Sequence, residues 1–188
     1  TLIISIIAGA TIKKISKGTG IKNIVRSMPN TPGSIGMGIT VWTQSKAVSE
    51  AQHELASQVL TALGKEVWVE EEQFLDKATA LSGTGPAYVF LFMEAMIDAG
   101  VHMGFSRRVS EELVTETMRG SVAYYTHPDT FSHVTRLRNH VTSPGGTTAE
   151  AMYYLEKAGF RTAISRAIWA AYEKSISLGK DVKATPPD

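Results

Sequence analysis

The sequence predicts a predominantly helical chain in which part of an α/β sheet, residues 1–70, precedes an all-α region, residues 71–188. Up to Glu70, short apolar runs alternate with helical patterns, which is typical of a sheet covered by helices. After Glu70 only helical periods occur. The 188 residues are 43% hydrophobic and 20% charged, an ordinary globular composition that fits one large domain or two small ones.

The first region contains four predicted strands, over residues 2–7, 23–27, 39–43 and 66–69. The run at residues 2–7 is apolar without alternation, which favours a strand covered on both faces of a parallel sheet. A loop with two prolines, residues 28–32, ends the second strand. Ser49 and Gln52 have capping-box spacing, so a helix is expected to begin there, and Gly64 is expected to close it.

The second region opens with Glu70, Glu71 and Glu72, which we interpret as an exposed helix start. A short helix over residues 73–80 and a break at residues 82–85 precede Pro86, expected at the first position of a helix that ends near Met103. This helix is apolar on nearly every face, which indicates a central core helix or one shared between subunits. Further helices are predicted after Ser106, after Thr147 and over residues 161–178, and near-helical spacing links Phe131, Val134, Leu137 and Val141. A loose tail is expected at residues 183–188.

Charge and composition exclude several kinds of partner. The formal net charge is +1 and no basic run occurs, so neither nucleic acid nor an acidic membrane surface is expected as a partner. The apolar helix after Pro86 carries Glu94, Asp98 and His102, which would be costly in lipid. Cysteine is absent and the five histidines lack metal-ligand spacing, so no metal site is expected.

The most informative segment is residues 141–150, a hydroxyl-rich loop that contains two glycines and leads into a helix. Thr147 and Glu150 have capping-box spacing, which predicts that the helix begins here. Its first amides and the positive end of its dipole would face the loop, and glycine lets a ligand approach the backbone closely. The pattern predicts a site for a small carboxylate. A plain turn followed by an ordinary helix cap explains the spacing equally well.

Three motifs, in order along nearly the whole chain, resemble the pyrroline-5-carboxylate reductase family. They are Arg26-Ser27-Met28-Pro29-Asn30-Thr31-Pro32, Leu81-Ser82-Gly83-Thr84-Gly85-Pro86-Ala87-Tyr88 and Ser143-Pro144-Gly145-Gly146-Thr147-Thr148. The resemblance implies a Rossmann remnant at residues 1–70 and a helical dimerisation and substrate-binding domain at residues 71–188. It implies hydride transfer from NADP or NAD to the imine of 1-pyrroline-5-carboxylate, giving L-proline, in a homodimer that can assemble further into a ring of dimers.

The resemblance also implies the site residues. The substrate carboxylate would be held by the Ser143 side chain and by the backbone amides of Gly145, Gly146 and Thr147. Thr148 would be the catalytic residue, with its hydroxyl beside the ring nitrogen for orientation and proton relay. The residues expected to lie against the cofactor are Ile6, Ile7, Ala8, Met28, Pro29 and Asn30.

Two features depart from the family pattern: the connection from Tyr125 to Asn139 is longer than in many relatives, and no Gly-x-Gly-x-x-Gly occurs in the sequence. We therefore expect the chain to begin inside the Rossmann domain and, by itself, to bind cofactor weakly and be inactive. The choice between NADH and NADPH stays open, and a cytoplasmic location is expected, with a mitochondrial one left open. Two alternatives remain: an inert helical dimerisation module, and a β-hydroxyacid-type dehydrogenase. The latter usually places a lysine on its long helix, whereas residues 86–103 contain none.

Overall fold

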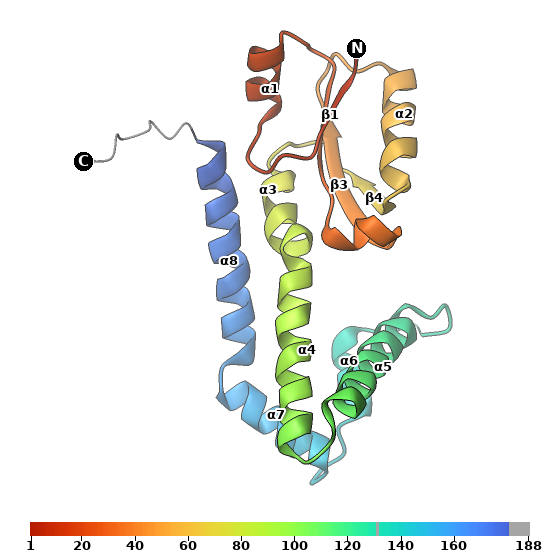
Figure 1. The fold of residues 1–188 in the computed structure, drawn as a ribbon, viewed down its shortest axis with the longest axis vertical. Helices are drawn as coiled ribbons and strands as arrows, with labels where there is room; N and C mark the ends of the chain where they lie inside the picture. Colours follow the sequence, from red (N-terminus) through yellow and green to blue (C-terminus); the bar gives the residue numbers. More distant parts are fainter. Residues whose placement is uncertain (131, 181–188) are drawn as a thin grey trace, which may run out of the picture. The chain divides into compact units, whose positions relative to one another are not determined.

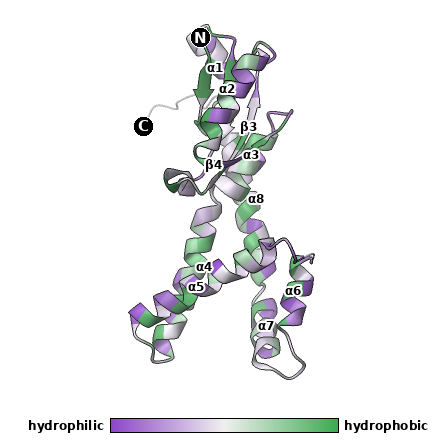
Figure 2. Ribbon diagram, turned by 90° about the vertical axis from the view of Figure 1, so that its right-hand side faces the viewer, coloured by the Kyte–Doolittle hydropathy of each residue, from purple (hydrophilic) through white to green (hydrophobic). Residues whose placement is uncertain are grey.

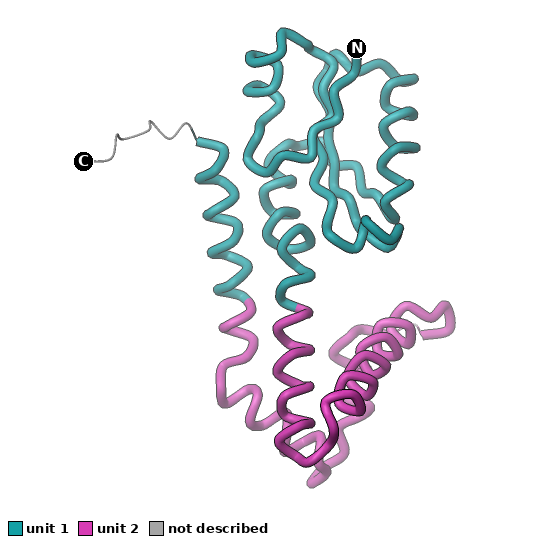
Figure 3. Tube along the Cα trace, viewed as in Figure 1, with its two compact units in different colours: residues 1–88, 165–188 teal, residues 89–164 magenta. Residues whose placement is uncertain are grey.

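The computed structural model describes residues 1–130 and 132–180, which form two compact units (Figures 1 and 3). The first unit consists of residues 1–88 with the described part of 165–188, and the second of residues 89–164. The unit borders lie inside the helices α4 (Gly85–His102) and α8 (Phe160–Gly179). The sequence pattern instead divides the chain between residues 70 and 71, and that domain boundary stays a prediction. Phe131 and the tail at residues 183–188 lie outside the described residues.

The first unit contains a four-stranded sheet in the order β1 (Ile3–Ser5), β2 (Ile24–Met28), β3 (Gly38–Gln44) and β4 (Gly64–Trp68). All four predicted strands are thus confirmed. β1 pairs with β2 and β3 with β4 in parallel, but β2 and β3 are antiparallel. The reason is the short connection at residues 29–37, because a parallel crossover needs a dozen residues or more.

Helices α1 (Ile12–Thr19) and α2 (Glu50–Thr61) lie on opposite sides of this sheet (Figure 1). The core on the α2 side consists of Val25, Trp42, Ala56 and Leu60, all buried. Side chains alternate across a strand, so Arg26 and its cross-strand partner Thr43 lie on the other face. The Ser49–Gln52 capping box at the start of α2 is confirmed, with both reciprocal hydrogen bonds present.

Gly64 does not close α2, contrary to the prediction. The helix ends at Thr61 with Ala62 as its C-cap, and Gly64 begins β4 with φ 127°. A Cβ atom at this position would lie 2.6 Å from the Gly38 nitrogen. The glycine is therefore required by the close approach of two strand backbones, in a conformation that other residues rarely adopt.

The predicted break before Pro86 is a π-helical turn. Helix α3 (Phe74–Ala78) continues into this turn (Thr79–Gly83), and α4 follows after Thr84. The Thr84 amide donates to the Thr79 carbonyl, five residues back, at 2.8 Å. Pro86 is the second residue of α4, and a proline there cannot donate to Ser82 and would clash with its carbonyl in a regular α-helix. The extra residue of the π-turn relieves this conflict.

The remaining helices agree closely with the sequence pattern. They are α5 (Arg107–Thr126), α6 (Val134–His140), α7 (Thr147–Lys157) and α8. Ser106 caps α5 by accepting from the Val109 amide at 3.3 Å, and His127 ends it, as predicted.

The helical stretch Phe74–His102 is the part of the described chain that is long and apolar enough to cross a membrane, by length and composition alone. Apolar residues recur along α4 (Figure 2), and Phe90 and Leu91 are 63% and 67% exposed. The same helix carries Glu94 and Asp98, and Asp98 forms an ion pair with Arg107 at 3.0 Å. Charged groups of this kind disfavour a lipid environment. The exposed apolar surface of α4 instead suits contact with protein.

Candidate functional site

Two turns of the predicted site lie at one edge of the sheet. Parallel β1 and β2 place Ser5 beside Arg26, so the turns that follow both strands leave the sheet at the same edge. The Ser27 hydroxyl donates to the Ser5 carbonyl at 3.0 Å and joins the two strand ends. Ile6 and Ile7 are 61% and 63% exposed. This edge therefore offers apolar surface at the carboxyl ends of parallel strands, where nucleotides bind in doubly wound sheets.

The structure brings Ile6, Ile7, Ala8, Met28, Pro29 and Asn30 together at this edge. Met28 is only 7% exposed, and a Cβ added at Gly83 would lie 3.4 Å from its sulfur, so its side chain belongs to the packed interior. Asn30 accepts from the Ile39 amide at 3.0 Å and holds the 3₁₀ turn at Thr31–Ile35 against β3. The cofactor role of all six residues stays a prediction.

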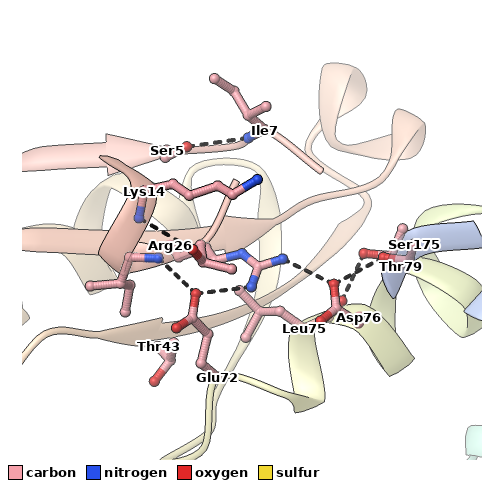
Figure 4. A network of polar contacts seen from close by, with 12 residues as sticks. Ser5, Ile7, Lys14, Arg26, Thr43, Glu72, Leu75, Asp76, Thr79 and Ser175 are labelled. Atoms are coloured by element: carbon pink, nitrogen blue, oxygen red, sulfur yellow. Dashed lines mark hydrogen bonds and ion pairs between the residues drawn. The ribbon is translucent and has the colours of Figure 1, made fainter. Parts of the chain in front are cut away.

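A buried ion-pair network lies directly behind this edge (Figure 4). The Arg26 side chain is 1% exposed and forms ion pairs with Glu72 at 3.0 Å and Asp76 at 3.1 Å. Glu72 also accepts from the Ile12 amide at 2.8 Å, and Asp76 accepts from the Ser175 hydroxyl at 3.0 Å. One guanidinium therefore joins β2 to the start of α1, to α3 and to the end of α8.

Sequence reasoning missed this network. We interpreted Glu72 as part of an exposed acidic helix start, but only Glu70 and Glu71 are exposed, and Glu72 is half-buried against Arg26. A signal was present, since an arginine in the middle of an apolar strand needs a buried anionic partner. The identity of that partner was not readable, because it lies 46 residues away along the chain.

The second half of the predicted site is the loop before α7, in the second unit. The Gly146 amide donates to the Ser143 carbonyl at 3.0 Å, and Gly145 has φ 70°. Pro144 and Gly145 are thus the central residues of a type II turn, which favours proline second and requires positive φ third. The amide of Gly146 is used inside this turn, and its contact with the substrate carboxylate stays a prediction.

The predicted capping box at Thr147 and Glu150 is wrong. Helix α7 begins at Thr147, its N-cap is Gly146, and no side chain caps it. The Glu150 amide donates to the Gly146 carbonyl at 3.2 Å. Gly146, the last residue of the type II turn, has an extended conformation and takes the cap position, so Thr147 lies in the first turn of the helix.

The missing cap leaves an uncommitted group of donors. Within the described part of the chain, two sets of groups donate no hydrogen bond. They are the backbone amides of Gly145, Thr147, Thr148 and Ala149 and the side-chain hydroxyls of Ser143, Thr147 and Thr148. The loop is exposed, with Thr148 half-buried. Helix amides that point outward carry partial positive charge and bind small anions. The structure therefore gathers Ser143, Gly145, Thr147 and Thr148 into an arrangement suited to a carboxylate.

The helical part of the chain decides which family it represents. Residues 72–178 match the family model described as pyrroline-5-carboxylate reductase dimerisation, and this match covers more than half of the chain. The chain belongs to the pyrroline-5-carboxylate reductase family. The pyrroline-5-carboxylate reductase of Synechocystis is 41% identical over 179 residues, 95% of this chain and 66% of that protein. That of Pisum sativum is 37% identical over 94% of this chain and 64% of its own length.

Solved structures of pyrroline-5-carboxylate reductases agree. The Plasmodium falciparum pyrroline carboxylate reductase, solved with NADP bound, has a TM-score of 0.90 and 40% identity, and covers 96% of this chain and 68% of its own. The Coxiella burnetii pyrroline-5-carboxylate reductase has a TM-score of 0.86 and 38% identity, with 95% and 66% covered. The chain thus spans a little under two thirds of the length of the curated relatives above. The predicted combination of Rossmann remnant and helical dimerisation domain is confirmed.

Proposed function

We propose that the protein containing this chain reduces the imine of 1-pyrroline-5-carboxylate to L-proline with NADPH or NADH. The observation that carries this proposal is the uncommitted donor group at Ser143–Thr148 in a chain of this family. The product needs a hydride at the imine carbon and a proton at the nitrogen, and the substrate presents a carboxylate on the ring carbon bonded to the other side of that nitrogen. A donor group for that carboxylate is what a positioning site requires.

The loop residues have distinct proposed roles. The amides of Gly145 and Thr147, with the Ser143 hydroxyl, hold the carboxylate and fix the ring. The Thr148 hydroxyl, half-buried and without a partner among the described residues, lies beside the ring nitrogen and orients it. A threonine hydroxyl is a weak acid, so it relays a proton through water and is not the ultimate donor.

The cofactor supplies the hydride, and the residues at the sheet edge fit a nicotinamide dinucleotide. Ile6 and Ile7 present apolar side chains, and Pro29 and Asn30 follow a strand end held by the Ser27–Ser5 hydrogen bond. The Plasmodium falciparum relative is solved with NADP. The alternative dehydrogenase with a lysine on its long helix is disfavoured, because α4 contains no lysine.

An activity measurement on the intact protein tests the proposal. We expect imine-dependent oxidation of NADPH or NADH with 1-pyrroline-5-carboxylate, and formation of proline in equal amount. A 2-keto acid such as pyruvate, which lacks the imine, should not support cofactor oxidation. Failure to make proline with either nucleotide, in a folded protein, would leave the inert dimerisation module as the better reading.

The helical unit is also proposed to form the homodimer. The family model describes a dimerisation segment, and within it α4 exposes Val89, Phe90, Leu91 and Phe92. Apolar side chains exposed on several faces of one helix mark an interface. Assembly of dimers into a ring is a further proposal, which the mass of the wild-type protein by sedimentation equilibrium tests.

Leu91→Asp is expected to convert the dimer largely to monomer, because a charge would be buried without a partner, at a cost of several kcal/mol. Sedimentation equilibrium measures the change. Leu55→Asp is the matched control, since Leu55 is 51% exposed on α2 and lies outside the dimerisation segment. A Leu91→Asp protein that stays dimeric would remove α4 from the interface.

A further inference from the structure

The last turns of α8 are linked to the two sheet-edge turns by separate routes, both within the first unit. The first route is polar and is visible in Figure 4. Ser175 on α8 is 2% exposed, and its hydroxyl donates to Asp76 Oδ1 at 3.0 Å. The same oxygen accepts from Arg26 at 3.1 Å. Arg26 lies two residues before Met28, the last residue of β2, after which the second turn begins.

The second route is a backbone contact. Gly9, which directly follows Ile6, Ile7 and Ala8, has φ 73°, and a Cβ on it would lie 2.8 Å from the Leu178 carbonyl carbon. A Cβ on Gly179 would lie 3.3 Å from the Gly9 oxygen. Only glycine permits this approach, so the end of α8 packs directly on the turn after β1.

We propose that the end of α8 is a positioning element for the dinucleotide, with Ser175 as the residue that fixes it to β2. The proposal rests on the function proposed above, in which residues 6–8 and 28–30 face the cofactor. The hydroxyl of Ser175 stabilises the Asp76 carboxylate, which in turn binds Arg26. The backbone contact of α8 with Gly9 restricts the conformation of the turn after β1. The final helix of the dimerisation segment thereby sets the shape of the cofactor edge.

The chemistry of Ser175 supports a specific role. Serines on helices commonly donate to a carbonyl on the preceding turn, as the exposed Ser177 does to Lys174 at 2.7 Å. Ser175 instead donates to a carboxylate 99 residues away. Hydrogen bonds to charged groups are stronger than neutral ones, and this bond is partly buried.

Hydrogen exchange of the chain tests the proposal without cofactor. In Ser175→Ala, we expect the amides in residues 6–10 and 28–33 to exchange about tenfold faster, the effect of losing one charge-assisted hydrogen bond. Residues 39–43 in β3 should exchange as in the wild type. Ser177→Ala is the matched control, because it removes a serine hydroxyl from the same turn without touching Asp76, and it should change neither segment.

Equal acceleration in residues 39–43 would mean that Ser175 contributes only general stability, and would overturn the proposal. So would unchanged exchange in both turns. A second variant, Asp76→Asn, tests whether the effect of Ser175 passes through Asp76: Ser175→Ala should have a smaller effect in that background than in the wild type.

In the intact protein, Ser175→Ala should raise the Kd for NADPH about tenfold and leave proline affinity unchanged. A wild-type protein that binds no nucleotide would contradict the proposed function, whereas the exchange result would still report on the α8 contact. Nucleotide binding that is normal in the wild type and unaffected by Ser175→Ala would instead contradict the positioning role alone.

Discussion

Arg26→Met is expected to lower the free energy of unfolding of the first unit by about 3 kcal/mol, the lower end of the range for breaking a buried ion pair. The guanidinium is 1% exposed, whereas the Glu72 and Asp76 side chains are 32% and 20% exposed. Loss of the cation leaves two carboxylates close together with reduced access to water. Their partial exposure lets them relax, which is the reason for the lower value.

Urea unfolding followed by tryptophan fluorescence measures this change, because all three tryptophans, Trp42, Trp68 and Trp169, belong to the first unit. Lys46→Met is the control. It removes an exposed cation from the same unit and should change the unfolding free energy by no more than about 0.5 kcal/mol. An Arg26→Met chain as stable as the wild type would show that the network does not support the fold.

Thr148→Val is expected to lower kcat of the intact enzyme by about 100-fold, the lower end of the contribution of a positioned proton-transfer group. Valine has the shape of threonine without the hydroxyl. The backbone amides of the loop are unchanged, so KM for 1-pyrroline-5-carboxylate should move little. Steady-state kinetics with each substrate varied in turn measures both constants.

Thr148→Ser restores the hydroxyl and should recover kcat to within about tenfold of the wild type. Thr147→Val is a useful comparison, because Thr147 lies one position earlier at the helix start and its proposed contact with the carboxylate uses its amide. A Thr148→Val enzyme with normal kcat would reduce Thr148 to an ordinary first-turn residue.

Local patterns in this sequence predicted structure well where neighbouring residues determine it. The Ser49–Gln52 capping box and the Ser106 cap need only three residues of chain, and both are present. The Thr147–Glu150 box has the same spacing but fails, because Pro144 and Gly145 form a type II turn that puts Gly146 in the cap position. Capping spacing is therefore informative only together with the turn before it.

Features that depend on distant residues were not predictable from spacing. The antiparallel pairing of β2 with β3 and the role of Gly64 follow from which backbones meet across the sheet. The Arg26 network joins residues 26, 72, 76 and 175, and no motif relates these positions. The loop at Ser143–Thr148 was found because its residues are consecutive and resemble a family signature.

The central claim is that the open amides at the start of α7 bind the substrate carboxylate. Titration of the chain with 1-pyrroline-5-carboxylate or proline, followed by the backbone amide NMR signals of Gly145, Thr147, Thr148 and Ala149, tests it most directly. We expect saturable shifts of these signals, with the Gly146 amide, already bonded to Ser143, shifting least. Signals at α7 that stay unchanged at saturating ligand, while amides elsewhere shift, would contradict the account.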